Sequence, residues 1–447
     1  MKGFYEATPF GNTLIIGAGP AGIHAAVDWS RVSGRLGLLN RKGRHADRVK
    51  EALQEREFHL ACEVSVAGKR HLSGTAKVDR FYEGYQELDD IWHTVVICTP
   101  SDRYAEVIVS LRLEKLREVK RVILLSPGIG SGAWVRSLLG GDSGRIEVVS
   151  FSTYYAASKF SPDPGSMLKP VVKGMKRRVY IGSGSPHSPA CQTIKALLET
   201  IGVDCIIAGS PLEAESRSIT TYVHPPFFMS EFSLEEIFSR SSSKKSMYKL
   251  YPEGPITPLA IRTMVLLWKE ITRVMKRFKV QPLNLLKFLN DDNYPVCEQS
   301  IGREEIERFP DLEQHRQEYL LYVRYASLLI DPFSEPDEQG SYFDFSAVPF
   351  KQVSMDKDGC WTIPRIPFED YRKLKLLFEL GQRLGVRMPQ SQELLERFER
   401  IRHAFVKEQG ANRFRPEWFE DHTKAQADAI FDTVNPEGGK HVFRKTT

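Results

Sequence analysis

The chain contains 447 residues, of which 41% are hydrophobic, so it is long enough for two domains that each bury a core. Its 62 basic and 57 acidic residues give a formal net charge of +5 and are interspersed along most of the sequence. Nucleic-acid binding is therefore not indicated, whereas a basic pocket for an anionic substrate is compatible with this charge.

The cysteines and the N-terminus indicate where the protein works. The six cysteines form no CxxC pair and no metal-ligand spacing, so we expect reduced thiols and no metal site. The N-terminus lacks a basic region followed by an apolar stretch, and no apolar run approaches the length needed to cross a bilayer. We therefore expect a soluble, cytoplasmic protein without membrane contact.

The first half alternates short apolar runs with helical stretches, which is the pattern of parallel strands joined by crossover helices. The clearest strands are predicted at residues 13–16, 36–39, 94–98 and 122–126, and further strands at 146–150, 179–181 and 205–208. A helix is predicted over residues 189–200, between the last two strands. This order predicts an α/β fold with an N-terminal, doubly wound parallel sheet in a domain of residues 1–212.

From about residue 213 the strand signals fade, and long amphipathic helices are predicted at residues 258–278, 313–330, 368–384 and 391–408. Residues 241–246 and 331–340 are rich in Ser or in Pro and Gly and are predicted to be loops. The stretch after residue 410 has little apolar periodicity and is predicted to pack loosely. Residues 213–447 are therefore predicted to form a mainly α-helical domain.

A glycine-rich turn follows the first predicted strand. The run from Gly17 to Gly22 reads GxGxxG between an apolar strand and a helix, which is the context that this motif requires in a Rossmann domain. Gly17 permits the tight turn, Gly19 lets the backbone approach a pyrophosphate, and Gly22 allows the helix to pack closely on the strand. These three glycines, with Pro20 and Ala21, form the predicted phosphate-binding site at a helix N-terminus. The alternative is a glycine-rich turn with only a structural role.

The end of the second strand indicates which dinucleotide binds. An acidic residue there would bind the ribose hydroxyl of NAD, but this strand ends in Asn40 and Arg41. Arg41, with Arg44 and Arg48, offers charge and bidentate donors for a 2′-phosphate, which favours NADP, although a solvated basic loop is the alternative. We also assign to cofactor binding the two residues after the third clear strand, Thr99 and Pro100.

His224 is the candidate catalytic residue. It lies in the run Tyr222-Val223-His224-Pro225-Pro226, close to the predicted boundary between the sheet domain and the helical domain. Clefts between domains commonly form active sites. Reducing a ketone or an imine requires a group that donates and accepts a proton near neutral pH, as histidine does. A lone histidine is nevertheless more often structural, so its position alone leaves both roles open.

Asp331 is the candidate partner of this histidine. It follows a strongly apolar predicted helix and could orient and stabilise a charged imidazole. A turn residue before Pro332 is at least an equal alternative from the sequence alone.

Together these residues resemble the opine dehydrogenases, and more narrowly the branch that makes opine-type metallophores. The likeness runs over nearly the whole chain and is carried by residues 17–22, 148–154, 222–229, 251–257, 319–334 and 342–350. It implies that NADPH reduces the imine formed between a 2-oxo acid and the amine of a histidine-aminobutyrate intermediate, and that the product rather than the enzyme binds metal.

The resemblance also implies residue roles. A His-Pro dipeptide supplies the catalytic histidine in the wider family, which corresponds to His224, and a later aspartate partners it, which corresponds to Asp331. The wider family has an acid pair at that second site, whereas this chain has Ile330-Asp331. In the metallophore branch an arginine that closes the second strand and a nearby basic residue hold the 2′-phosphate, which corresponds to Arg41 and one of Arg44 or Arg48.

The segment after the shared Ser-Phe-Ser-Thr-Tyr run bears on the choice of oxo acid, and we assign Tyr154 and Ala157 to substrate specificity. Pyruvate-using relatives have an acid at the place of Ala157, where a carboxylate would repel the distal carboxylate of 2-oxoglutarate by several kcal/mol at an effective dielectric near ~20. Ala157 removes this repulsion and favours 2-oxoglutarate. Lys159 could add attraction, although an exposed lysine without a role is the more common case.

Two other functions stay open. One is a different NADP-linked reductase that acts on a free 2-oxo acid without an amine. The other is a non-catalytic protein that senses NADPH and binds a partner through its helical domain. We expect small-molecule substrates in either enzymatic case, and a homodimer formed through the helical domain.

Overall fold

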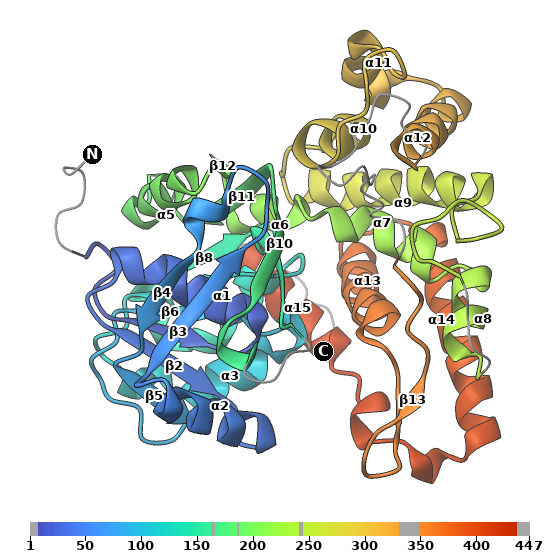
Figure 1. Cartoon of the computed structure of the whole chain (residues 1–447). Helices are drawn as coiled ribbons and strands as arrows, with labels where there is room; N and C mark the ends of the chain where they lie inside the picture. Colours follow the sequence, from blue (N-terminus) through green and yellow to red (C-terminus); the bar gives the residue numbers. More distant parts are fainter. Residues whose placement is uncertain (1–7, 162–165, 186, 241–244, 330–347, 436–447) are drawn as a thin grey trace, which may run out of the picture. The chain divides into compact units, whose positions relative to one another are not determined.

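The computed structural model describes residues 8–161, 166–185, 187–240, 245–329 and 348–435. The chain divides into two compact units, Met1–Ser218 with Asp432–Thr447, and Ile219–Phe431, which are taken in turn below (Figure 1). The functional division at residue 212 stays a prediction. No helix of the described residues is long and apolar enough to cross a membrane.

The first unit is built on an eight-stranded sheet with the order β12-β11-β8-β7-β6-β1-β2-β5. The strand β1 pairs in parallel with β2 and β6, and parallel pairing continues to β5 on one side and through β7 to β8 on the other. The strands are β1 Thr13–Ile16, β2 Leu36–Asn40, β5 Arg80–Glu83, β6 Thr94–Ile97, β7 Arg121–Leu124, β8 Glu147–Phe151, β11 Arg178–Ser183 and β12 Asp204–Ile207. The predicted Rossmann-type sheet is confirmed, and all seven predicted strands are among its eight; the remaining strand, β5, was not predicted.

The sheet departs from the prediction at one edge, where β11 runs antiparallel to β8 and β12 is parallel to β11. Parallel neighbours need a crossover connection, which is usually a helix. Between β8 and β11 the chain instead passes through β9 (Ala156–Lys159) and β10 (Val171–Met175), so β11 returns in the opposite direction.

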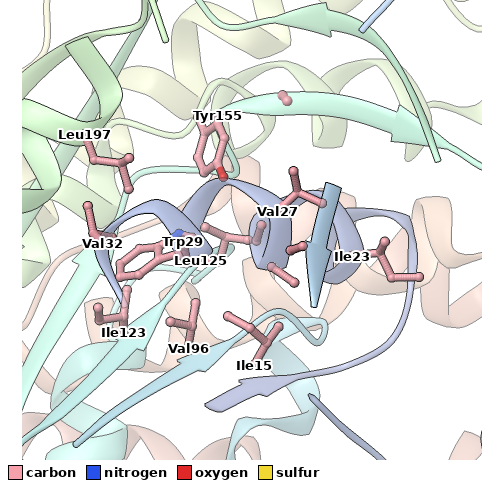
Figure 2. Packing of buried hydrophobic residues seen from close by; sticks show 14 of the residues in the cluster. Ile15, Ile23, Val27, Trp29, Val32, Val96, Ile123, Leu125, Tyr155 and Leu197 are labelled. Atoms are coloured by element: carbon pink, nitrogen blue, oxygen red, sulfur yellow. The ribbon is translucent and has the colours of Figure 1, made fainter. Parts of the chain in front are cut away.

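Helix α1 (Pro20–Trp29) packs its buried face on the parallel strands. Ile23, Val27 and Trp29 are at most 2% exposed, and each large apolar side chain buried in this way contributes roughly 1.5–3 kcal/mol. Figure 2 shows the strand residues Ile15, Val96 and Ile123 on one side of α1 and Tyr155 on the other. The helix is therefore covered on both sides.

A small four-stranded sheet, with the order β4-β3-β10-β9, covers the second side of α1. The strand β3 (His59–Val64) pairs with β4 (Gly74–Lys77) and with β10. This sheet was not predicted from the sequence. The other helices of the first unit are α2 Arg44–Glu55, α3 Tyr104–Leu111, α4 Ser131–Leu139, α5 Pro189–Thr200 and α6 Pro211–Ser216.

The second unit is mainly α-helical, as predicted. Thr257 caps the 20-residue helix α9 by accepting a hydrogen bond from the amide of Ala260 at 3.0 Å. The long helices α13 and α14 run side by side, from orange to red in Figure 1. The helices are α7 Ile219–Phe228, α8 Glu231–Phe238, α9 Pro258–Arg277, α10 Leu285–Lys287, α11 Arg303–Arg308, α12 Gln314–Leu329, α13 Arg365–Arg383 and α14 Pro389–Gln409, and a hairpin joins β13 (Ser354–Met355) to β14 (Trp361–Thr362).

The expectation of loose packing after residue 410 holds only in part for the described residues, because most of residues 411–422 are exposed but a packed helix follows them. Helix α15 spans Thr423–Val434, and Ala427 and Ile430 on it are fully buried. Two buried positions three residues apart are enough to pack a short helix against the protein. They are too few to give a clear apolar periodicity in the sequence.

Candidate active site

The glycine-rich turn has the geometry of a phosphate-binding site. Gly17 has φ of +106°, and a Cβ on Gly22 would lie 1.8 Å from the carbonyl oxygen of Gly17, so a larger residue at position 22 would collide with backbone. A Cβ on Gly19, in contrast, would meet no atom within 4 Å. Gly19 therefore leaves open space in front of the helix where its backbone could approach a ligand.

The start of α1 offers unpaired donors beside this space. Pro20 and Ala21 begin the helix, and its N-cap, Gly19, has no side chain that could cap the first-turn amides. Thr99 lies next to the turn, with its Cγ2 3.4 Å from the position of a Cβ on Gly17. The hydroxyl of Thr99 is buried and has no hydrogen-bond partner among the described residues, and Pro100 follows it, three residues after the end of β6. The helix start, the open space and this hydroxyl fit a bound dinucleotide pyrophosphate.

Two residues that the sequence analysis did not assign hold the turn in place. The side-chain oxygen of Asn40 accepts a hydrogen bond from the amide of Ala18 at 3.1 Å, and the Nε2 atom of His45 lies 3.1 Å from the carbonyl oxygen of Ala18. Asn40 ends β2 and His45 belongs to α2, so side chains from two elements outside the turn fix its conformation. Asn40 stands where an NAD enzyme would carry an acid, which was the available sequence signal.

The three basic candidates are all exposed around the start of α2. Arg41 follows β2, and its guanidinium lies 3.9 Å from a carboxylate oxygen of Glu106, which also pairs with Arg103 at 3.2 Å. Arg44 is the first residue of α2, and Arg48 lies one turn later. An exposed ion pair at the longer distance is weak, so Arg41 is available to a phosphate at little cost.

Tyr154 is tied to α1 by a buried polar network. Its hydroxyl lies 2.6 Å from Nδ1 of His24 and 3.1 Å from the hydroxyl of Ser158, and Nε2 of His24 lies 3.2 Å from Asp28. The hydroxyl of Tyr155 also donates to Asp28, at 3.0 Å, from the position seen in Figure 2. Burial lowers the pKa of His24 although Asp28 opposes the shift.

A neutral His24 fixes the direction of these bonds. An ionised carboxylate only accepts, so Nε2–H donates to Asp28 and Nδ1 accepts the proton of Tyr154. The network thereby joins the helix that begins at the glycine-rich turn to the segment that leads into β9. Ala157 lies on β9 and is exposed.

A buried carboxylate, Glu215, anchors the end of the first unit. It accepts hydrogen bonds at 2.7 Å from the amides of Gly130 and Gly132 and from the hydroxyl of Ser150. Burial raises the pKa of Glu215 to about 7, against the effect of these donors. Glu215 thus connects α6, just before the second unit begins, to the N-terminus of α4 and to β8.

His224 lies in α7, directly before two prolines, and its ring is held by an aspartate other than the predicted one. Its Nδ1 is 3.0 Å from Oδ1 of Asp370 on α13, and their side chains are 13% and 7% exposed. The ring packs against Phe228 at 4.9 Å between centroids. Because a carboxylate accepts, Nδ1 carries the proton, and Nε2 makes no hydrogen bond within the described part of the chain. Nε2 is therefore the atom able to take up and return a proton.

Further charges surround this pair. Glu369, next to Asp370, is 3.0 Å from Arg365 and 2.6 Å from Lys373. Burial opposes the ionisation of Glu369, but Lys373, Arg365 and His224 outweigh it and lower the pKa of Glu369. Glu369 is therefore a carboxylate already paired with two cations, directly beside the aspartate that contacts the ring.

The predicted partner, Asp331, lies outside the described residues. No sequence signal marked Asp370, because it is 146 residues away from His224 and sits in an ordinary amphipathic helix. Among the described residues no group of three or more His, Cys, Asp or Glu could hold a metal ion.

The chain matches the family model described as staphylopine dehydrogenase over residues 11–434. It is 46% identical over 425 residues to pseudopaline synthase of Pseudomonas aeruginosa, covering 94% of this chain and 96% of that protein. It is 38% identical to staphylopine synthase of Staphylococcus aureus, covering 97% of each. Its fold matches yersinopine dehydrogenase with bound NADP+ at a TM-score of 0.87 and 33% identity, covering 95% of this chain and 99% of that one. The resemblance to opine-metallophore enzymes is thus confirmed, and the chain belongs to the staphylopine dehydrogenase family of oxidoreductases.

Proposed function

We propose that the protein catalyses an NADPH-dependent reductive condensation. A 2-oxo acid, preferentially 2-oxoglutarate, would react with the amine of a histidine-aminobutyrate intermediate to give a metal-chelating opine. The observation that carries the proposal is the ring of His224, whose Nδ1 is held at 3.0 Å by Asp370 while Nε2 is left for substrate.

The cofactor would be held by residues around the glycine-rich turn. Gly17, Gly19, Gly22 and the first-turn amides of α1 suit the pyrophosphate, and Thr99 offers a hydroxyl beside it. Arg41, with Arg44 or Arg48, would bind the 2′-phosphate. When bound, NADPH supplies the hydride that reduces the imine carbon. A solved relative contains NADP+, in agreement with this preference.

His224 would move the proton that the condensation requires. As the amine nitrogen adds to the oxo carbon, Nε2 takes up the proton that this nitrogen releases. Nε2 returns this proton to the oxygen, which gives the carbinolamine, and then carries the remaining nitrogen proton to the hydroxyl, which leaves as water and produces the imine. Asp370 would keep the ring in the correct tautomer and stabilise its charged form, and acid–base catalysis of this kind contributes about 100- to 10,000-fold.

Ala157 supports 2-oxoglutarate as the oxo acid because it brings no negative charge to its exposed position on β9. Tyr154 would keep this segment against α1 through its bond to His24. An acidic residue at position 157 would repel a second carboxylate in the substrate.

We also propose that the enzyme works in the cytoplasm as a homodimer. All six cysteines are free thiols, which suits a reducing compartment. Light scattering of the purified protein would test the dimer.

The test of this function is NADPH oxidation followed by absorbance with the histidine-aminobutyrate amine and either 2-oxoglutarate or pyruvate. Parallel reactions omit the amine or replace NADPH by NADH. We expect oxidation that depends on the amine and is faster with 2-oxoglutarate and NADPH. Oxidation without the amine would favour a simple 2-oxo acid reductase, and NADPH binding without turnover would favour a sensing protein.

A further inference from the structure

The register of β9 and β10 brings a second residue beside Ala157. The strands are antiparallel, with Gly174 opposite Ala157 and Met175 opposite Ala156. The amide of Lys176 donates to the carbonyl of Tyr155 at 2.9 Å, so the pairing continues one residue beyond β10. A Cβ on Gly174 would lie only 3.8 Å from that of Ala157, so nothing bulky separates Ala157 from the end of β10.

The two faces of this strand pair differ. Ala156 belongs to the hydrophobic core of the first unit, and Met175 packs against that core. Because side chains alternate along a strand, Gly174 and Lys176 belong with Ala157 to the opposite face. Lys176 directly follows β10 and lies two residues after Gly174, the register partner of Ala157, whereas Lys173 lies at the irregularity in the register between Val172 and Gly174.

The environment of Lys176 is unusual for a lysine. Its side chain is half-buried, whereas Lys159 on β9 and Lys173 on β10 are exposed. Burial lowers the pKa of Lys176. No carboxylate of the described residues pairs with its ammonium group. A partly desolvated ammonium group without a counter-ion among the described residues is less stable than one in water, and an anionic ligand would relieve this cost.

We propose that Lys176 binds the distal carboxylate of a dicarboxylic 2-oxo acid. Ala157 would provide the space for this carboxylate, and Lys176 would provide its charge partner. This inference rests on the proposed function. It assigns to Lys176 the attraction that favours 2-oxoglutarate over pyruvate, whereas Ala157 only avoids a repulsion. A partly desolvated lysine is a stronger partner than an exposed one, which separates Lys176 from Lys159.

The experiment combines a change in the enzyme with a matched change in the substrate. Wild type, Lys176→Met and the control Lys159→Met are assayed with NADPH and saturating amine while 2-oxoglutarate, pyruvate or 2-oxoglutaramate is varied. The last compound replaces the distal carboxylate by a neutral amide. NADPH binding, followed by fluorescence, reports whether each variant is folded.

We expect Lys176→Met to raise the KM for 2-oxoglutarate roughly 10- to 100-fold, the size expected for one lost hydrogen bond between charged groups. The KM values for pyruvate and 2-oxoglutaramate should change less than about threefold, as should all values in Lys159→Met. Lys176→Arg, which keeps the charge, should retain the preference for 2-oxoglutarate over its amide, and it supplies the test if Lys176→Met does not fold.

Several results would overturn the role of Lys176. One is an equal rise of KM for all three oxo acids in Lys176→Met, and another is an equal effect of Lys159→Met. A loss of the preference for the carboxylate in Lys176→Arg, with NADPH binding intact, would also count against it. A wild-type enzyme that prefers pyruvate would instead contradict the proposed oxo acid, and Lys176 would then have no distal carboxylate to bind.

Discussion

Replacing Asp370 by Asn tests the assignment of the histidine partner. The substitution keeps the size of the side chain but removes its charge, while the 3.0 Å contact with Nδ1 of His224 becomes a neutral one. The Asn amide group can also donate to Nδ1, which would put the ring proton on Nε2. We expect both the charge stabilisation and the correct tautomer to be lost.

The size of the effect follows from the geometry. Unit charges about 4 Å apart at an effective dielectric near 20 interact by about 4 kcal/mol. The side chains of His224 and Asp370 retain 13% and 7% exposure, so solvent screens part of this interaction. A loss of roughly 2–3 kcal/mol in the transition state corresponds to a kcat lowered about 30- to 150-fold.

The assay measures kcat in the amine-dependent reaction, with NADPH affinity determined separately by fluorescence. Glu369→Gln is the matched control, because it removes one negative charge at the neighbouring residue without touching the ring of His224. We expect Glu369→Gln to lower kcat less than tenfold and both variants to bind NADPH like wild type. If Asp370→Asn kept more than a third of the wild-type kcat, or if both variants were equally slow, Asp370 would not be the partner.

Four further predictions concern the cofactor, the oxo acid and stability. Arg41→Ala should raise the KM for NADPH about tenfold without changing that for NADH, and an unchanged ratio would exclude a 2′-phosphate contact. Ala157→Asp should reverse the preference from 2-oxoglutarate to pyruvate in the same kinetic assay. Gly19→Ala should have a Tm close to that of wild type but bind NADPH weakly in a fluorescence titration. Gly22→Ala should bind NADPH weakly and also have a lower Tm, because its Cβ would lie 1.8 Å from a carbonyl oxygen. Because burial raises the pKa of Glu215 to about 7, the folded protein keeps a proton that the unfolded chain releases. The free energy of unfolding should therefore fall by at most roughly 3 kcal/mol between about pH 4.5 and 7. In denaturant titrations, Glu215→Gln should show a smaller decline of stability over this pH range than wild type.

The parts of the fold that were predicted are those with a strong local pattern. The strand, turn and helix around Gly17 combine an apolar run, three glycines and Pro20 within ten residues. Helix α5 matches its predicted bounds because Ser188 caps it and Pro189 begins it, while α9 differs from its prediction by one residue.

The parts that were missed depend on contacts between distant segments. The small sheet pairs β3 with β10, about a hundred residues apart, and its short strands are partly exposed, so their hydrophobic pattern is weak. The reversed direction of β11 is not encoded in its composition. His224 lies in a helix despite the two prolines after it, and its contact with Asp370 exists only through the packing of α7 on α13.

The most direct test of the proposed reaction is its stoichiometry, measured on the wild-type protein with both substrates and NADPH. Mass spectrometry of the products, together with the absorbance of NADPH, gives the molecules of each product formed per cofactor oxidised. We predict one secondary-amine product, carrying both the amine and the 2-oxoglutarate skeleton, for each NADPH oxidised, and none when the amine is left out. Formation of a 2-hydroxy acid at the same rate with or without the amine would contradict the account.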